Sequence, residues 1–278
     1  MSKSIAICNQ KGGVGKTTTA VNLGAYLALS GKKILLIDLD SQGNATAASG
    51  VNRNRIERTV YDALVEGAAL EELTKPSSVA GLDVVPSSMD LAGAELTIAE
   101  KPERDTILRR LCQPIRDRYD VVLFDCPPSL GLISVNALVA ADGLLIPVQC
   151  EYLALEGLNA LMQAIELVKR GPNPSLSVFG LVLTMADFRV RLAKEVAEEV
   201  RKFYKELVFD TTIPRSVRLA ESPSFGKPIS HYDPHSPGGQ AYAALADEVA
   251  RKILSDSNGN GSPEPAGNPA VEPQNTQG

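Results

Sequence analysis

Short apolar runs alternate with amphipathic stretches along most of the chain. The apolar runs predict buried strands, and stretches in which apolar residues recur every three or four positions predict helices. The predicted strands are Ile5–Cys8, Ile34–Ile37, Leu82–Pro86, Val121–Phe124, Gly143–Val148 and Val178–Leu183. The predicted helices are Ala20–Leu27, Thr59–Leu64, Leu91–Glu100, Glu103–Tyr119, Ala154–Arg170, Arg191–Tyr204 and Gln240–Leu254. Such alternation is typical of an α/β fold with a mostly parallel, twisted sheet and helices on both faces.

The length and composition of the chain fit one large α/β domain. The 278 residues are 44% hydrophobic but only 5% aromatic, which predicts a core of aliphatic side chains. We assign residues 1–254 to this domain. Residues 255–278 are rich in Ser, Asn, Gly, Pro and Glu and contain no Lys or Arg. Because this composition cannot bury a core, we predict a disordered tail.

Charge and cysteine content limit the ligands and the cellular compartment that we expect for the protein. The net charge is −5, which does not indicate a general nucleic-acid binder but permits a local basic patch. The four cysteines form no Cys-x-x-Cys pair, so buried free thiols are favoured over a zinc site or disulfides. We find no apolar run of membrane-spanning length and no signal peptide. These features predict a cytoplasmic protein.

The segment from Gln10 to Thr18 has the composition of a phosphate-binding loop. It lies between a predicted strand and a predicted helix, and its glycines leave backbone N–H groups free to face an anion. In such a loop Lys16 would reach the β- and γ-phosphates, and the Thr17 hydroxyl would ligate Mg²⁺. A tight turn without a ligand is the alternative, but a turn does not require this lysine and these threonines.

The loop departs from the general P-loop pattern at its first position. Gly-x-x-x-x-Gly-Lys-Ser/Thr requires a glycine where this chain has Gln10, and a second lysine, Lys11, opens the loop. The residues expected to bind the nucleotide here are Lys11, Gly12, Gly13, Val14, Gly15, Lys16, Thr17 and Thr18.

Carboxylates follow two of the predicted strands. Asp38 and Asp40 come at the end of Ile34–Ile37, and Asp125 follows Val121–Phe124. Ligands of open parallel sheets bind outside the carboxyl ends of the strands. An apolar strand that ends in Asp, downstream of a P-loop, has the Walker B arrangement that holds Mg²⁺. The segment 127–131 is then expected to sense the γ-phosphate.

Five segments resemble the ParA/MinD family of deviant-Walker P-loop NTPases, and within it the Soj-like ParA proteins of chromosome and plasmid partition. The resemblance runs from about Ile5 to Leu254. Ser41 departs from the family, in which proline is usual, and this could loosen the turn after Asp40. The five segments are Asn9–Thr19, Asp38–Asn44, Phe124–Ser129, Leu183–Arg189 and Ile213–Pro223.

The resemblance implies a role for each matching residue of a site for ATP and Mg²⁺. Lys11 resembles the signature lysine, which reaches the partner's phosphates in an ATP-bound sandwich homodimer. Asp40 resembles the carboxylate that positions the attacking water, so Lys11, Lys16 and Asp40 are the expected catalytic residues. Because a cation delivered in trans neutralises charge on the γ-phosphate, ATP hydrolysis would depend on dimerisation. The expected metal residues are Thr17, Asp38 and Asp125, and the residues expected to pack the adenine are Met185 and Pro214.

The resemblance also implies that the dimer binds double-stranded DNA without sequence preference. The expected contacts are Arg189, Arg191, Arg215 and Arg218, and a solvated basic face is the alternative on charge alone. Dimerisation would double this patch, which matters because affinity rises with the number of phosphates neutralised. A ParB-type, centromere-bound partner would stimulate slow hydrolysis and release the DNA. This cycle would segregate DNA and place the protein on the nucleoid.

Three other functions are compatible with parts of this set of sequence motifs. A MinD-like membrane ATPase requires a basic amphipathic C-terminal helix, whereas the final predicted helix has mixed charge. A relative of the nitrogenase iron protein requires two suitable thiolates, and only Cys126 lies beside the Walker B aspartate. A ParA-like positioner of another cargo would share every motif named above. We therefore expect a partition ATPase that does not bind membranes, with cargo positioning as the nearest alternative.

Overall fold

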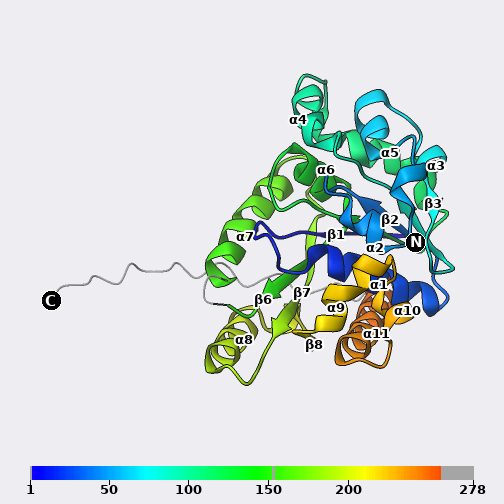
Figure 1. The fold of residues 1–278 in the computed structure, drawn as a ribbon. Helices are drawn as coiled ribbons and strands as arrows, with labels where there is room; N and C mark the ends of the chain where they lie inside the picture. Colours follow the sequence, from blue (N-terminus) through cyan, green and yellow to red (C-terminus); the bar gives the residue numbers. More distant parts are fainter. Residues whose placement is uncertain (1, 152–153, 258–278) are drawn as a thin grey trace.

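The computed structural model describes residues 2–151 and 154–257 and shows one central sheet covered by helices (Figure 1). The sheet has eight strands in the order β3-β4-β2-β5-β1-β6-β7-β8. Only β3 runs antiparallel to its neighbour, and all other pairs are parallel, which confirms the predicted fold class. The strands are β1 (Lys3–Ile7), β2 (Ile34–Asp38), β3 (Lys75–Pro76), β4 (Leu82–Val85), β5 (Val121–Asp125), β6 (Gly143–Gln149), β7 (Ser177–Ala186) and β8 (Val208–Pro214).

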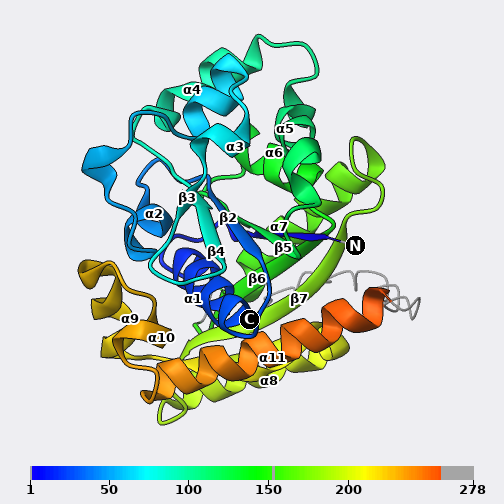
Figure 2. The same ribbon diagram turned by 90° about the vertical axis from the view of Figure 1, so that its right-hand side faces the viewer.

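Helices cover both faces of the sheet because successive strand residues point in opposite directions. Ala6 and Phe124 pack into one core with residues of α4 to α8, whereas Ile5 and Leu123 pack into the other with residues of α1, α2, α10 and α11. Figure 2 shows α4 and α5 on one side of the sheet and α1 and α11 on the other. The helices are α1 (Lys16–Leu29), α2 (Asn44–Ala48), α3 (Leu70–Leu73), α4 (Leu91–Ala99), α5 (Ile107–Arg116), α6 (Leu132–Ala140), α7 (Ala154–Arg170), α8 (Arg191–Tyr204), α9 (Val217–Glu221), α10 (Ile229–Tyr232) and α11 (Pro237–Ser257).

Several elements differ from the sequence-based expectation. The predicted helix Glu103–Tyr119 begins only at Ile107, because Glu103 has a left-handed backbone with φ of 53° that interrupts a helix. The predicted helix Thr59–Leu64 is a π-helical turn, Asp62–Glu66. Helix α6 was not predicted, since a mostly buried helix without charged residues shows little amphipathic period. Strand β8 was also missed, because its sequence mixes apolar and polar residues.

The last helix extends past its predicted end at Leu254. Helix α11 continues to Ser257, and Asp256 in its last turn forms an ion pair with Lys3 at 2.9 Å. Residues 255–257, which we assigned to the tail, are therefore helical. The rest of the predicted tail lies outside the described residues. Among the described residues, no helix has the length and apolarity needed to cross a membrane.

Candidate nucleotide site

The order of the central strands brings the predicted phosphate loop and the predicted carboxylates together. Strand β5 lies between β2 and β1, so Asp125 is paired in register with Asp38 on one side and with Ile7 on the other. The phosphate loop follows β1 directly and leads into α1. The three segments therefore meet at the carboxyl edge of the sheet, where ligands of open α/β sheets bind.

The backbone of the phosphate loop has the conformation of an anion cradle. Gly13 and Gly15 have φ values of 74° and 90°, in the left-handed region that favours glycine. Gly15 is the N-cap of α1 and has no side chain to occupy the first-turn N–H groups. Those donors and the helix dipole remain available to an anion. On the other side of the loop, the Thr184 hydroxyl donates to the Val14 carbonyl at 2.8 Å and ties the loop to β7.

Lys16 is a buried cation without a carboxylate partner among the described residues. Its side chain folds back so that Nζ donates to the Lys11 carbonyl at 3.2 Å, and the residue is only 7% exposed. Buried charges are normally paired, because removing an ion from water is costly. An anion bound at the loop would supply the missing partner.

Asp125 is a buried carboxylate that has no hydrogen bond of normal geometry among the described residues. The residue is fully buried, including both carboxylate oxygens. Burial, followed by the charge of Asp38, raises the pKa of Asp125 well above its usual value, although the nearby Thr17 hydroxyl and Lys16 oppose this shift. A bound cation would lower the pKa of Asp125 and favour the ionised carboxylate.

Asp38 lies beside Asp125 but is held by hydrogen bonds. Its Oδ2 accepts from the backbone N–H and hydroxyl of Thr46 at 2.8 and 2.6 Å, and its Oδ1 accepts from the Asp40 N–H at 3.2 Å. Burial raises the pKa of Asp38 to about 6, against the lowering effect of these donors. Sequence reasoning missed Thr46, which also accepts from the Ser87 N–H and joins α2 to the end of β4.

The turn after β2 is closed despite Ser41. Gly43 donates its N–H to the Asp40 carbonyl at 2.9 Å, and Asp40 Oδ1 accepts from the Gln42 N–H at 3.0 Å. Gly43 has φ of 60°, which this turn requires. The half-buried Asp40 side chain is therefore positioned without the proline that the family pattern has at position 41.

The head of the phosphate loop is fixed by Asn9, a residue to which sequence reasoning gave no role. Its Nδ2 donates to the Pro147 carbonyl at 2.7 Å, and its Oδ1 accepts from the Lys11 N–H at 3.0 Å. The side chain of Lys11 forms an ion pair with Glu151 of its own chain, with Nζ and Oε2 3.0 Å apart. Sequence reasoning did not identify Glu151, because this ion pair joins segments far apart in the sequence and no motif marks the residue.

The two predicted adenine residues lie at neighbouring strand ends. Pro214 ends β8 and is paired in register with Ala186, the residue after Met185 in β7. Met185 has φ of 50°, a strained conformation for a residue other than glycine. Such strain is found at functional sites when the surrounding structure holds it in place. The adenine role of both residues stays a prediction.

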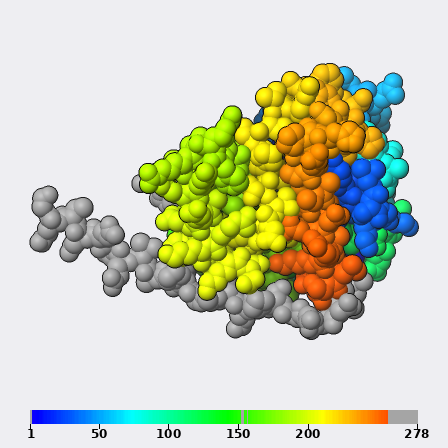
Figure 3. Space-filling view, turned by 90° about the horizontal axis from the view of Figure 1, so that it is seen from below, coloured from blue at the N-terminus to red at the C-terminus, as the bar shows by residue number. Residues whose placement is uncertain are grey.

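The four predicted DNA-contacting arginines lie on exposed surface near the carboxyl ends of β7 and β8. Each forms an ion pair within the chain. Figure 3 shows the segment from α8 to α9, coloured yellow-green to yellow, as a continuous surface beside the orange α11. The pairs are Arg189–Asp187 at 2.6 Å, Arg191–Glu195 at 2.6 Å, Arg215–Glu151 at 3.8 Å, and Arg218 with Glu221 at 3.2 Å and Asp233 at 3.4 Å.

All four cysteines are buried free thiols, as predicted. The described residues contain no group of three or more His, Cys, Asp or Glu side chains that could hold a metal ion by themselves. Mg²⁺ usually takes one or two carboxylates together with phosphate oxygens. Thr17 and Asp125 fit that mode if a nucleotide and water supply the remaining ligands, and the metal role expected of Asp38 stays a prediction.

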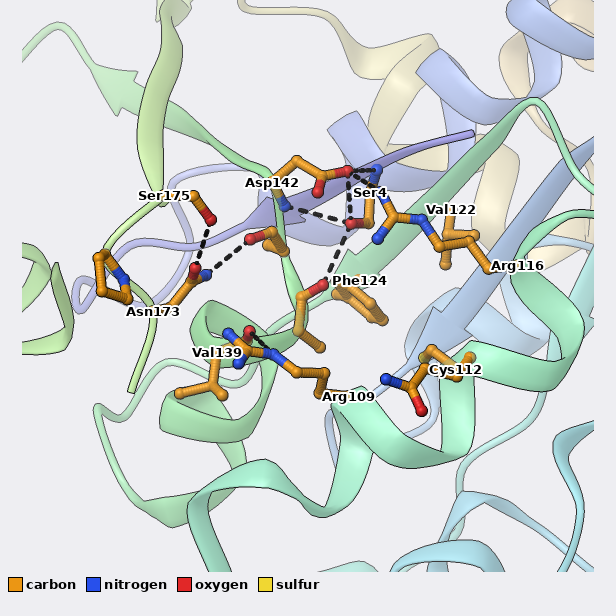
Figure 4. Close-up of a pocket in the computed structure, with 14 residues that line it drawn as sticks. Ser4, Arg109, Cys112, Arg116, Val122, Phe124, Val139, Asp142, Asn173 and Ser175 are labelled. Carbon is orange, nitrogen blue, oxygen red and sulfur yellow. Dashed lines mark hydrogen bonds and ion pairs between the residues drawn. The ribbon is translucent and has the colours of Figure 1, made fainter. Parts of the chain in front are cut away.

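A cavity of about 270 Å³ lies at the opposite, amino edge of the sheet (Figure 4). Its polar groups are used within the fold. Asp142 accepts from the backbone N–H and hydroxyl of Ser4 at 2.7 and 2.9 Å and pairs with Arg116. Asn173 donates to the carbonyls of Leu138 and Ala141. These contacts join the strand beginnings to α5 and α6, so this cavity is separate from the phosphate loop.

Comparison with known proteins agrees with the site. A family model described as an AAA domain matches residues 2–178. The chain is 50% identical over 250 residues to the sporulation initiation inhibitor protein Soj of Bacillus subtilis, covering 90% of this chain and 99% of that protein. It is 48% identical over 252 residues to the chromosome partitioning protein ParA of Myxococcus xanthus, covering 91% and 89%.

A solved structure with the same fold contains a nucleotide. Cobyrinic acid a,c-diamide synthase from Mycobacterium smegmatis, with bound ADP and magnesium, superposes with a TM-score of 0.81. It is 32% identical, and the match covers 92% of this chain and 97% of that one. With its deviant phosphate loop, its paired carboxylates and these relatives, the chain belongs to the ParA/MinD family of partition ATPases.

Proposed function

We propose that this protein is a DNA-partition ATPase that binds Mg-ATP, dimerises on it and binds DNA without sequence preference as the dimer. The observation that carries the nucleotide part is the pairing of two unsatisfied buried charges. Among the described residues, Lys16 has no carboxylate partner and neither Asp125 carboxylate oxygen has a hydrogen bond of normal geometry, and both lie at a loop whose helix N-cap, Gly15, has no side chain to occupy the first-turn N–H groups. A nucleotide phosphate with its cation would satisfy both.

Each residue of the site then has a defined task. The loop N–H groups and Lys16 would hold the phosphates, and Thr17 and Asp125 would hold Mg²⁺. The metal would neutralise phosphate charge. Asp40, at the mouth of the site, would orient the attacking water, while Asp38 would keep the start of α2 in place through Thr46. Lys11 would supply its charge to the facing subunit, so hydrolysis would require the dimer.

Support for DNA binding comes from the exposure of the arginines and from the partition proteins named above. The side chains of Arg189 and Arg191 are 90% and 92% exposed. Their ion pairs are weak, because exposed pairs contribute about 0–1 kcal/mol and are screened by salt. DNA phosphates could therefore replace the carboxylates, and two subunits would present twice as many contacts. A ParB-type partner would then accelerate hydrolysis and release the dimer from the DNA.

The switch is testable with a variant that binds ATP but does not hydrolyse it. Asp40→Ala removes the carboxylate proposed to orient water and leaves the phosphate loop intact. We expect this variant to be a monomer without nucleotide and a dimer with Mg-ATP, as measured by multi-angle light scattering. A variant that remains monomeric at saturating Mg-ATP would contradict the assembly switch.

A further inference from the structure

Glu151 lies at the junction of the nucleotide loop and the proposed DNA-binding surface. It follows β6, whose neighbours are β1 and β7, so the ends of three strands meet near it. Its Oε2 accepts from Lys11 Nζ at 3.0 Å. Its Oε1 accepts from Gln149 Nε2 at 2.6 Å and lies 3.8 Å from Arg215 Nη2. No motif in the sequence singles out this residue.

The position of the Glu151 carboxylate is set by local backbone contacts. The Glu151 N–H donates to the Gln149 carbonyl at 2.8 Å, and the Glu151 carbonyl accepts from the Ala154 N–H at 3.0 Å at the start of α7. Lys11 is held at both ends, since Asn9 accepts from its backbone N–H and Glu151 accepts from its ammonium group. The ammonium group is thus committed to a carboxylate of its own chain.

This contact competes with the role of Lys11 in the dimer. An ammonium group paired with Glu151 cannot at the same time neutralise phosphates in a facing subunit. The pair is 37% and 47% exposed, and exposed pairs of this kind are weak, so a triphosphate that carries several charges can displace the carboxylate. After Lys11 leaves, Arg215 remains beside Glu151, so the carboxylate keeps a cationic neighbour.

We propose that Glu151 is a positioning residue that holds Lys11 in its own subunit and so raises the ATP concentration needed for dimerisation. This inference rests on the proposed function, in which Lys11 acts across the dimer. A purely structural ion pair would behave differently, because its loss would leave the ATP concentration needed for dimerisation unchanged or raise it.

The test uses Glu151→Gln in the Asp40→Ala chain. Glutamine keeps the size of the side chain but removes its charge. We expect the Mg-ATP concentration that gives half dimer, measured by light scattering, to fall about two- to five-fold, the range that corresponds to one exposed ion pair. The affinity of the monomer for a fluorescent ATP analogue should stay unchanged, and the melting temperature should fall by no more than a few °C, as for the loss of any one exposed ion pair. The matched control is Glu103→Gln, which breaks the exposed pair with Arg110 at 2.9 Å far from the loop.

The outcomes separate this inference from the proposed function. If the Asp40→Ala parent does not dimerise with ATP, both fall together. If the parent dimerises but Glu151→Gln leaves the half-dimer concentration unchanged or raises it, the proposed role of Glu151 is wrong and the partition function stands. An equal shift in the Glu103→Gln control would also overturn the role, because the effect would then be one of net charge.

Discussion

The carboxyl edge of the central strands and the surface from α8 to α9 both collect charged side chains, but they differ in burial and pairing. At the strand edge, Lys16 and Asp125 are buried and, within residues 2–151 and 154–257, lack the ion-pair and hydrogen-bond partners that their charges require. On the outer surface, Arg189 and Arg191 are exposed and already bound to carboxylates. Buried unpaired charges indicate a ligand strongly, because the fold tolerates their cost only where something compensates it. Exposed paired charges indicate a partner weakly.

The largest expected effect follows from the buried side of this comparison. Lys16→Ala should lower ATP affinity by about 100-fold or more, because it leaves buried phosphate charge without its cation. Isothermal titration calorimetry with an ATP analogue measures the change. Lys33→Ala, at an exposed position before β2, is the control and should bind normally. Equal affinities of the two variants would show that the phosphate loop is not the nucleotide site.

A smaller effect is expected on the exposed side. Arg189→Ala and Arg218→Ala should each weaken DNA binding of the ATP-bound dimer by about three- to ten-fold and reduce the salt dependence by about one unit of slope. Gel shift with two unrelated duplexes should show the same loss on both. Arg110→Ala removes an equally paired arginine on α5 and is expected to change nothing. Undiminished binding of the first two variants would place the DNA contact elsewhere.

The paired buried carboxylates predict a pH effect on stability. Burial raises the folded-state pKa of Asp38 to about 6 and that of Asp125 well above its usual value. The contribution of these two groups to the stability of the ligand-free fold is therefore fully present at low pH, and the part from Asp38 is lost as pH rises through about 6. Asp125→Asn removes one charge. Its melting temperature without nucleotide should therefore exceed that of the wild type by a few °C at pH 8, with a smaller difference at pH 5.

With Mg-ATP, the melting temperature of the wild type should exceed that of Asp125→Asn at pH 8. Mg-ATP should stabilise the wild type, in which Asp125 can hold the cation, and should leave Asp125→Asn almost unchanged. Differential scanning calorimetry with and without Mg-ATP measures both effects. An Asp125→Asn variant that is less stable than the wild type at pH 8 without nucleotide would mean that the carboxylate has a stabilising partner in the protein.

The smallest expected effect tests whether Asp187 and DNA phosphates compete for Arg189. Asp187→Asn removes the carboxylate that holds Arg189 through two short contacts, at 2.8 and 2.6 Å. Because DNA phosphates then no longer have to displace a carboxylate from Arg189, DNA binding should strengthen about two- to five-fold. Fluorescence anisotropy at several salt concentrations would detect this change. A loss of affinity would indicate that Asp187 positions Arg189 for DNA rather than competing with it.

The sequence predicted elements best where their pattern is local. The β1 strand, the phosphate loop and α1 are contiguous, and their apolar run, glycines and Lys16 indicate both structure and chemistry. Helix α6 and strand β8 escaped prediction for opposite reasons. Helix α6 has no charged residue and is mostly buried, with its polar residues Ser134 and Asn136 buried as well, so its pattern shows little amphipathic contrast, whereas β8 carries polar residues, since it is the last strand at the edge of the sheet.

The sequence by itself determined the fold class, the phosphate loop with its second lysine, and the carboxylates that follow the strands. The tertiary structure alone decided which of these groups meet. The β2-β5-β1 order places Asp38 beside Asp125, and the neighbouring β6 places Glu151 against Lys11. Such contacts join residues far apart in the chain, so no local pattern encodes them, and whether a charge is paired or left for a ligand depends on them.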